Sequence, residues 1–342
     1  MRKLVQESKN LNDFINKILI GDSRKLLKLI PDNSIHLIIT SPPYWNAVTY
    51  DNENFIGNSS YEKYIADLLI VWKECERILV PNGKLCIVSP LMPIPKKLIN
   101  TQHTRHIKNI NTDIEFSILK ETNLKRYDMY IWQKQTSKLI FGSYPYPGNI
   151  YAQNTIEFIN IFVKDGEPLK RDKLLKEKNK ISQEEWRDLT QQVWFIYPKD
   201  VKRRQGHPAP FPEKLIARLI KMFTFGRCDE CNFPGDIVLD PFAGIGTTLK
   251  VAKQMGRRWI GIELSETYAS IAMEEIEKTE LNPDSVNVFI GFPKYPNREE
   301  CNRIFLNNRK QKDKNLLGKK HKKINYGRKI PIEKKKELNS KF

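Results

Sequence analysis

Short apolar runs alternate with stretches of helical periodicity along most of the chain. The runs at 17–20 and 35–39 are each long enough for one strand, and polar or proline-containing residues follow both. Residues 61–79 then place apolar side chains on one face of a helix. This repeated order of strand, helix and strand predicts an α/β fold with a parallel, doubly wound sheet.

The same alternation continues through the rest of the chain. Pro81, Asn82 and Gly83 predict a turn before the next apolar run. Helices are predicted at 213–223, 247–255 and 265–278, with Pro212 at the first position of the first one. Further strands are predicted at 84–89, 127–132, 156–163, 237–239 and 258–262.

The loop after the strand at 35–39 reads Thr-Ser-Pro-Pro-Tyr-Trp. Two consecutive prolines have no N–H to pair and fix their own φ, so the chain must leave the sheet as a stiff, extended segment. This segment carries the Ser41 hydroxyl, the Pro42 carbonyl and the aromatic faces of Tyr44 and Trp45. Rigid acceptors beside an aromatic face suit a planar ring with an amino group. The alternative is an ordinary proline-rich turn after a strand.

A second stretch, from Asp236 to Leu249, reads as a buried strand, a glycine-rich turn and a helix start. Glycines allow the backbone to approach a ligand, and an acid after the next strand, here Glu263, can hold ribose hydroxyls. The dinucleotide fingerprint requires a third glycine where this chain has Leu249. A dinucleotide is therefore not the favoured ligand.

Taken together, Ser-Pro-Pro-Tyr and Asp-Pro-Phe-x-Gly-x-Gly-Thr-Thr resemble the motifs of the amino-group DNA methyltransferases that use S-adenosyl-L-methionine. The resemblance covers roughly residues 15 to 280. The catalytic loop precedes the cofactor strand by about two hundred residues, which resembles the beta group of type II restriction-modification systems. It implies a circularly permuted Rossmann-like sheet with helices on both faces, a small inserted recognition module and a basic C-terminal tail.

The resemblance also implies an organisation of the chain in four parts. The catalytic part of the methyltransferase domain covers residues 1–164, and the cofactor-binding part of the same domain covers 205–280. Between them, residues 165–204 form an inserted module that is a candidate for DNA recognition, with a solvated linker as the alternative. Residues 281–342 form a basic extension.

Site residues follow from the same resemblance. Asp22 and Phe211 are expected to contact the cofactor. Each has an alternative, because Asp22 can be the N-cap of the following helix and Phe211 can be an ordinary core aromatic. The expected catalytic residues are Ser41, Pro42, Pro43 and Tyr44. The expected cofactor-binding residues are Asp22, Pro210, Phe211, Asp240, Phe242, Gly244, Gly246, Thr247 and Glu263.

The expected acceptor is an exocyclic amine. Methylation at C5 of cytosine needs a cysteine nucleophile, usually after proline, and none of the five cysteines follows a proline. A duplex hides the amine, so the base must be flipped out. Serine before Pro-Pro-Tyr favours N4 of cytosine within the family, with N6 of adenine as the alternative. A non-catalytic DNA-binding protein and an RNA methyltransferase are further alternatives.

Charge supports a nucleic-acid partner. The net charge is +18, and residues 301–342 hold 15 Lys or Arg against 3 Asp or Glu, so 15 − 3 = +12 lies there. This charge predicts a polyanionic partner, most commonly a nucleic acid. The resemblance implies that this partner is double-stranded DNA and that a cognate restriction endonuclease is a functional partner. The alternative for the tail alone is a solvated segment.

Cysteines, histidines and hydropathy bound the remaining possibilities. Five cysteines without a framework spacing and no signal peptide predict a reducing cytoplasm, and the resemblance implies that of a prokaryote. No apolar run is long enough to cross a membrane. His103 and His106 have no further ligands nearby, and Cys228 and Cys231 lack a second pair, so no metal site is expected and the two cysteines are predicted to be thiols in a loop.

Overall fold

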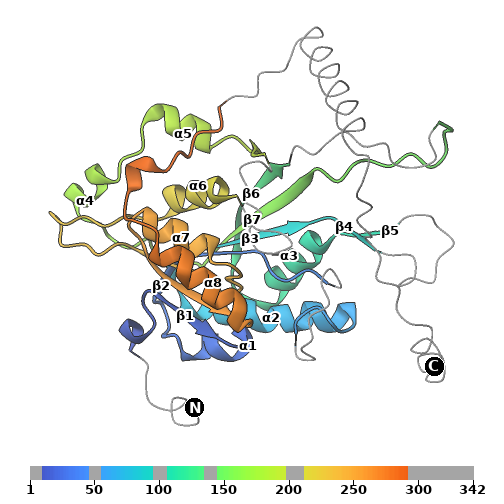
Figure 1. Ribbon diagram of the computed structural model, residues 1–342, viewed down its shortest axis with the longest axis horizontal. Coiled ribbons are helices and arrows are strands. Elements are labelled where there is room, and N and C mark those ends of the chain that lie inside the picture. The colour runs from blue at the N-terminus through green and yellow to red at the C-terminus, as the bar shows by residue number, and fades with distance from the viewer. Residues whose placement is uncertain (1–9, 46–54, 95–105, 135–144, 198–211, 292–342) are drawn as a thin grey trace, which may run out of the picture. The chain divides into compact units, whose positions relative to one another are not determined.

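The strand that precedes the proline loop, β2 (Ile35–Thr40), lies in the middle of a sheet between β9 (Ile237–Asp240) and β3 (Leu79–Pro90) (Figure 1). The structure is a computed structural model that describes residues 10–45, 55–94, 106–134, 145–197 and 212–291. Within these residues the sheet has eight strands in the order β1-β10-β9-β2-β3-β7-β6-β8. The remaining members are β1 (Lys17–Ile20), β6 (Lys125–Gln133), β7 (Ile156–Val163), β8 (Val193–Phe195) and β10 (Arg258–Glu263).

Every strand of this sheet except β7 runs in the same direction. Strands at both ends of the chain meet in its centre, because β2 pairs with β9 about two hundred residues later. A mostly parallel, doubly wound sheet is therefore confirmed. The circular permutation stays our interpretation of this strand order. A separate two-stranded sheet is formed by β4 (Met92–Ile94) and β5 (His106–Lys108).

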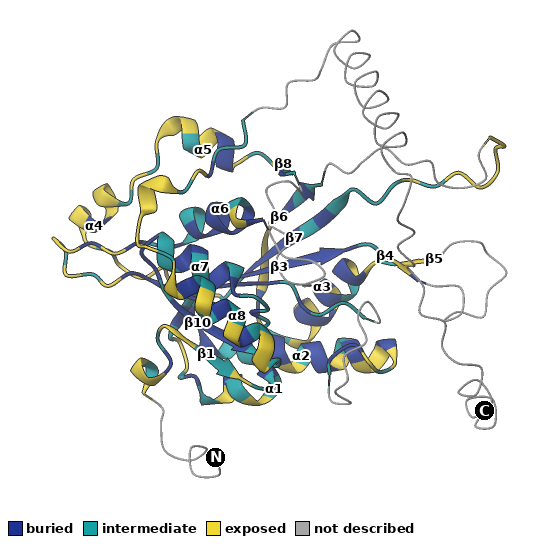
Figure 2. Ribbon diagram, viewed as in Figure 1, coloured by how far each residue is buried: buried dark blue, intermediate teal, exposed yellow. Residues whose placement is uncertain are grey.

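Helices cover both faces of the sheet, which confirms the layered architecture (Figures 1 and 2). Side chains alternate along β2, so Ile38 joins one apolar cluster while Leu37 and Ile39 join the other. One cluster is shared with α1 (Ser23–Leu26), α2 (Tyr61–Ile78) and α3 (Ile110–Glu121). The other is shared with α5 (Gln183–Leu189), α6 (Glu213–Phe223), α7 (Thr247–Gln254) and α8 (Glu266–Glu277).

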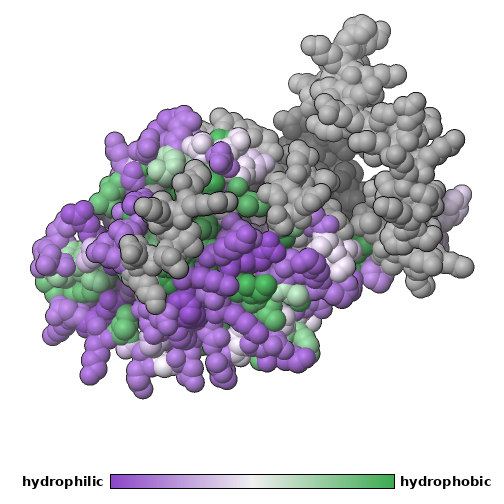
Figure 3. Space-filling view, turned by 90° about the horizontal axis from the view of Figure 1, so that it is seen from below, coloured by the Kyte–Doolittle hydropathy of each residue, from purple (hydrophilic) through white to green (hydrophobic). Residues whose placement is uncertain are grey.

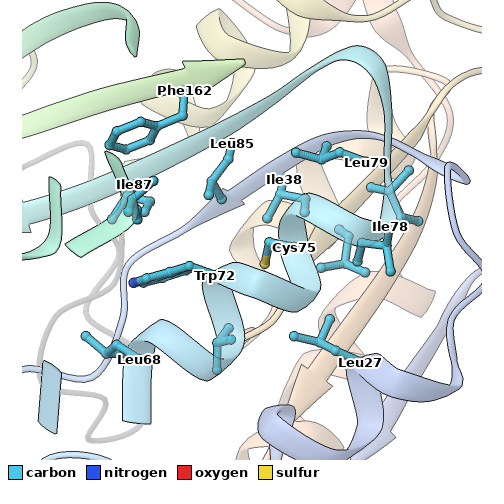
Figure 4. Close-up of a cluster of buried hydrophobic side chains, with 14 of the residues drawn as sticks. Leu27, Ile38, Leu68, Trp72, Cys75, Ile78, Leu79, Leu85, Ile87 and Phe162 are labelled. Atoms are coloured by element: carbon cyan, nitrogen blue, oxygen red, sulfur yellow. The ribbon is translucent and has the colours of Figure 1, made fainter. Parts of the chain in front are cut away.

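Helix α2 fills the first of these clusters. Ser60 caps its N-terminus by accepting a hydrogen bond from the Lys63 N–H, 3.2 Å away. Figure 4 shows Leu68, Trp72, Cys75 and Ile78 pointing from the helix toward side chains of β2 and β3. Their spacing of three and four residues is the periodicity that predicted the helix.

Three local features differ from expectation. The predicted turn at Pro81–Gly83 lies inside β3, at a bulge where four residues of β3 lie opposite one residue of β2. Asn82 has a φ of 61° there. Helix α3 was not predicted, because the preceding prolines obscure the buried Ile110, Ile114 and Ile118. Pro212 is the N-cap of α6 and not its first residue.

The two cysteines at 228 and 231 also differ from the expected free thiols. The structure pairs Cys228 with Cys231 in a disulfide on a tight turn. Among the described residues no group of three or more potential ligands is placed to hold a metal ion. His106 lies in β5, and His103 lies outside the described residues.

Figure 3 shows one face of the described surface. Hydrophilic side chains dominate the face seen from below, and the apolar patches on it are separate (Figure 3). No helix in the described segments has the length and apolarity that crossing a membrane requires.

All described residues belong to one compact unit, Met1–Gly291. Part of the predicted insertion packs into this unit through α5, α4 (Lys173–Lys178) and the buried ion pair of Asp188 with Arg218. Asp188 also accepts a hydrogen bond from the Gly291 N–H at 2.8 Å. The four-part division of the chain stays a prediction.

We expect this ion pair to be the main anchor of α5. Arg218→Leu leaves the buried Asp188 carboxylate without its cation, so the free energy of unfolding should fall by about 3–5 kcal/mol. Lys180→Leu, which removes an exposed pair with Glu177, is the matched control and should change stability by less than about 0.5 kcal/mol. Urea denaturation measures both. Equal stability of the two variants would show that α5 is not held in this way.

Candidate active site

The proline loop and the glycine turn are brought together by the pairing of β2 with β9. Both strands end at the same edge of the sheet, because they are parallel. The Thr40 hydroxyl, one residue before Ser41, donates a hydrogen bond to Asp240 Oδ1 at 2.8 Å. The structure therefore places the two motifs side by side, as the sequence predicts.

Asp240 holds this corner together. Its Oδ2 accepts from the Thr248 hydroxyl at 2.7 Å, and its Oδ1 also accepts from the Phe242 N–H at 3.0 Å. Burial raises the pKa of Asp240 to about 6, although these hydrogen bonds act in the opposite direction. The carboxylate thus ties two strand ends to the first turn of α7. A direct contact with the cofactor stays a prediction.

The glycine turn has the backbone that its sequence requires. Gly244 and Gly246 have φ values of 53° and 78°, in the left-handed region that favours glycine. A Cβ on Gly246 would lie 2.7 Å from Ala272 Cβ, so this glycine also permits close packing of α8. Thr247 is the first residue of α7.

Leu249 stands where a dinucleotide site would have its third glycine, and it is fully buried. Its space comes from the neighbouring strand, because a Cβ on Gly261 of β10 would lie 2.4 Å from Leu249 Cδ1. The close approach of helix and strand that a third glycine normally permits is therefore achieved from β10.

Glu263 ends β10 beside this turn. Its Oε2 accepts from the Gly244 N–H at 2.7 Å and its Oε1 from the Ser265 N–H at 2.9 Å. Burial raises the pKa of Glu263 above its ordinary value, with the backbone N–H groups opposing it. A carboxylate is thus fixed at the edge where the glycine turn begins.

Asp22 lies next in line, because β1 pairs with β10 and the Gly21 N–H bonds to the Glu263 carbonyl. It caps α1 through the Arg24 N–H at 2.9 Å and pairs with the Arg24 guanidinium at 2.8 Å. Burial raises the pKa of Asp22, but its hydrogen bonds and charge attraction to Arg24 outweigh this and lower the pKa overall. The capping role is present. The cofactor role stays a prediction.

The other predicted cofactor residues divide into two groups. Phe242 packs edge-on against Trp72 of α2, with ring centroids 6.3 Å apart, at the start of the glycine turn. Pro210 and Phe211 lie outside the described residues.

The proline loop carries a chain of hydrogen bonds. The Ser41 hydroxyl donates to Tyr44 Oη at 2.9 Å, and Tyr44 Oη donates to Glu157 Oε2 at 3.3 Å. Lys134 Nζ lies 2.5 Å from Glu157 Oε1. Burial raises the pKa of Tyr44 well above its ordinary value, so its phenol stays protonated.

Sequence reasoning did not identify Glu157, Lys134, Thr40 or Gly261. An acid near the start of the apolar run at 156–163 was a usable signal for Glu157. However, its place at the active edge depends on β7 running against the other strands. For Gly261 the signal was a glycine inside an apolar strand, which often marks a close packing contact.

Comparison with known proteins identifies the family. A model of the DNA methylase family of N6- and N4-methyltransferases matches residues 35–274, well over half of the chain. The chain belongs to this DNA methylase family. The resemblance deduced from the two motifs is thereby confirmed.

Individual relatives agree with this assignment. The type II methyltransferase M.MjaI of Methanocaldococcus jannaschii is 32% identical over 300 residues, which cover 76% of this chain and 91% of that protein. The type II methyltransferase M.HinfI of Haemophilus influenzae is 28% identical over 319 residues, which cover 87% of this chain and 79% of that protein. The chain is an amino-group DNA methyltransferase of the restriction-modification type.

Solved structures support the fold and the cofactor. A protein from Thermus thermophilus, described as a DNA modification methylase and solved with S-adenosyl-L-methionine, superposes with a TM-score of 0.61. It is 31% identical, and the match covers 77% of this chain and 95% of that protein. The cytosine-N4-specific PvuII DNA methyltransferase shares the fold, with a TM-score of 0.54 and 23% identity over 75% of this chain and 85% of that one.

The relative solved with S-adenosyl-L-methionine confirms the predicted cofactor, and the residues of this methylase fit it. The positive-φ glycine at 244 leaves a turn without a side chain beside the strand end. The carboxylate of Glu263 stands at that turn and can accept from ribose hydroxyls. Ile20, at the end of β1, is apolar yet 52% exposed, and it pairs in register with Glu263.

The raised pKa of Asp240 gives a stability prediction. Folding favours the protonated form of Asp240. Its contribution to the free energy of unfolding is therefore fully present below about pH 4 and is lost as the pH rises through about 6. Asp240→Asn does not ionise. The difference 6 − 3.8 corresponds to about 3 kcal/mol, so the wild type should lose up to that much stability relative to the variant between about pH 4 and pH 7.

Urea denaturation at several pH values, followed by tryptophan fluorescence, measures this change. Parallel stability curves for the two proteins would contradict the shifted pKa. The absolute destabilisation by Asn does not matter for this test, because only the pH dependence of the difference is compared.

Proposed function

We propose that this methylase transfers a methyl group from S-adenosyl-L-methionine to the exocyclic N4 amino group of a cytosine flipped out of double-stranded DNA. The observation that carries the proposal is the Ser41 hydroxyl on a stiff loop beside the cofactor turn, held by the bond from Thr40 to Asp240. Serine in this motif favours cytosine. Methylation at N6 of adenine is the second candidate, because both acceptors are aromatic amines.

The chain's own residues orient the acceptor. The lone pair of an exocyclic amine is delocalised into the ring, so hydrogen bonds from its N–H groups to Ser41 Oγ and the Pro42 carbonyl favour a more pyramidal nitrogen. Bound S-adenosyl-L-methionine supplies a methyl group that is already electrophilic on its sulfonium sulfur. The protein then contributes mainly alignment, which alone can provide a large rate enhancement.

Tyr44 is proposed to stack on the flipped base. Its phenol is held by Ser41 and Glu157, which fixes the ring at the sheet edge. The basic charge of the chain provides phosphate contacts, so affinity for DNA should fall steeply as salt rises. We further propose that the protein protects host DNA from a cognate restriction endonuclease.

Expression in a host without DNA methylation tests the proposal. Sequencing that separates N4-methylcytosine from N6-methyladenine should show N4-methylcytosine at one recognition sequence. Methylation only at adenine would establish the second candidate. Methylation of RNA, with RNA competing against DNA as the substrate, would indicate a different substrate class.

Tyr44→Ala should reduce DNA marking by about 10- to 100-fold, the range expected for loss of one base–aromatic stack. Tyr127→Ala is the matched control, because Tyr127 is 52% exposed and lies near the start of β6, at the opposite edge of the sheet. Marking at the wild-type level in Tyr44→Ala would show that this ring does not stack on the target base.

A further inference from the structure

Glu157 is a buried acid that the proposed roles of the catalytic loop do not explain. It lies near the start of β7, where it pairs in register with Pro90 of β3 and Trp132 of β6. Because β7 is antiparallel to its neighbours, it starts at the edge where the parallel strands end. This reversal brings Glu157, which is 7% exposed, to the proline loop.

Glu157 forms an ion pair through Oε1, the carboxylate oxygen that does not contact Tyr44. Lys134 follows the end of β6, and its Nζ contacts Glu157 Oε1 at 2.5 Å. The same ammonium lies 5.4 Å from the centre of the Trp132 ring. A carboxylate with a cation on one oxygen and a phenol on the other remains an acceptor at both.

This acceptor fixes the direction of the whole hydrogen-bond chain. Because a carboxylate only accepts, Tyr44 must donate its proton to Glu157 Oε2. The Tyr44 oxygen then accepts from the Ser41 hydroxyl. Ser41 donates its only hydroxyl proton to Tyr44, so its remaining lone pairs can only accept. An amino group, which donates, is the complementary partner.

We propose that Glu157, held by Lys134, is a positioning residue that orients the Tyr44 and Ser41 hydroxyls so that Ser41 Oγ presents a lone pair to the target amine. The proposal rests on the proposed function, because it assumes that Ser41 faces the amine. Aligned hydrogen bonds polarise one another, so the carboxylate also makes Ser41 Oγ a better acceptor. Glu157 does so without touching the substrate.

A purely structural ion pair is the competing explanation. It predicts that changing Glu157 affects folding or binding and acts independently of Tyr44. The proposal predicts instead that the effect passes through Tyr44. A double-mutant cycle separates the two explanations, because residues acting in one chain give non-additive losses.

The variants are Glu157→Gln, Tyr44→Phe and the double variant. Glutamine keeps the size of the side chain but can donate as well as accept, so the direction of the chain is no longer fixed. Phenylalanine keeps the aromatic face and removes the hydroxyl. Glu121→Gln is the matched control, because Glu121 forms a partly exposed pair with Lys73 at the end of α3.

The measurement is single-turnover methyl transfer from tritiated S-adenosyl-L-methionine to plasmid DNA from a methylation-free host, with enzyme in excess. Each single variant should lose about 10- to 100-fold in rate, the range for a hydrogen bond to a charged group. The double variant should be no slower than the slower single variant. Dissociation constants for the cofactor and for DNA should change by less than about threefold, and the control should match the wild type.

A wild-type rate in either Glu157→Gln or Tyr44→Phe would overturn the proposal, and so would losses that multiply in the double variant. A loss explained by weaker cofactor or DNA binding would assign Glu157 a structural role only. If Glu157→Gln does not fold, a wild-type rate in Tyr44→Phe still overturns the proposal. If the wild type itself marks no DNA, the proposed function fails first; if it marks DNA and the variants match it, only this inference fails.

Discussion

The carboxylate of Asp240 is the interaction on which the rest of the active site depends. It joins the end of β2 to the end of β9 and to the first turn of α7, through Thr40, Phe242 and Thr248. Parallel pairing puts the two strand ends at one edge, but it does not by itself fix the loops that follow. The buried, hydrogen-bonded acid provides that restraint. The proline loop and the glycine turn therefore keep a constant relation, although they lie about two hundred residues apart.

Much of this arrangement could be predicted from the sequence, because its determinants are local. The apolar run that forms β2, the two prolines after it and the glycines before α7 each specify their own backbone. What could not be predicted depends on partners that are distant in the chain. Gly261 makes room for Leu249 from another strand, and Glu157 reaches Tyr44 only because β7 is reversed. Helix α3 was missed because the prolines before it dominated the local pattern. The insertion was predicted from its charge, whereas the buried contact between Asp188 and Arg218 could not be predicted from it.

The reversed strand adds something that a fully parallel sheet would lack. In a parallel sheet, loops after strand ends supply the functional groups, and all of them approach from the same side. The start of β7 brings a charged residue to the same edge from the opposite chain direction. The carboxylate and its lysine complete a chain of polar groups that begins at Ser41. One sheet edge therefore carries both the glycine turn and the polar chain that we propose to accept hydrogen bonds from an aromatic amine.

The central claim is that a single cleft, between the glycine turn and the proline loop, holds the cofactor and the target base together. A crystal structure of the protein with the cofactor analogue sinefungin tests this most directly. The account predicts that the analogue's ribose contacts Glu263 and that its amine, which takes the place of the transferable methyl group, faces Ser41 and Tyr44. An analogue bound with that amine turned away from the proline loop, or bound elsewhere on the protein, would contradict the account.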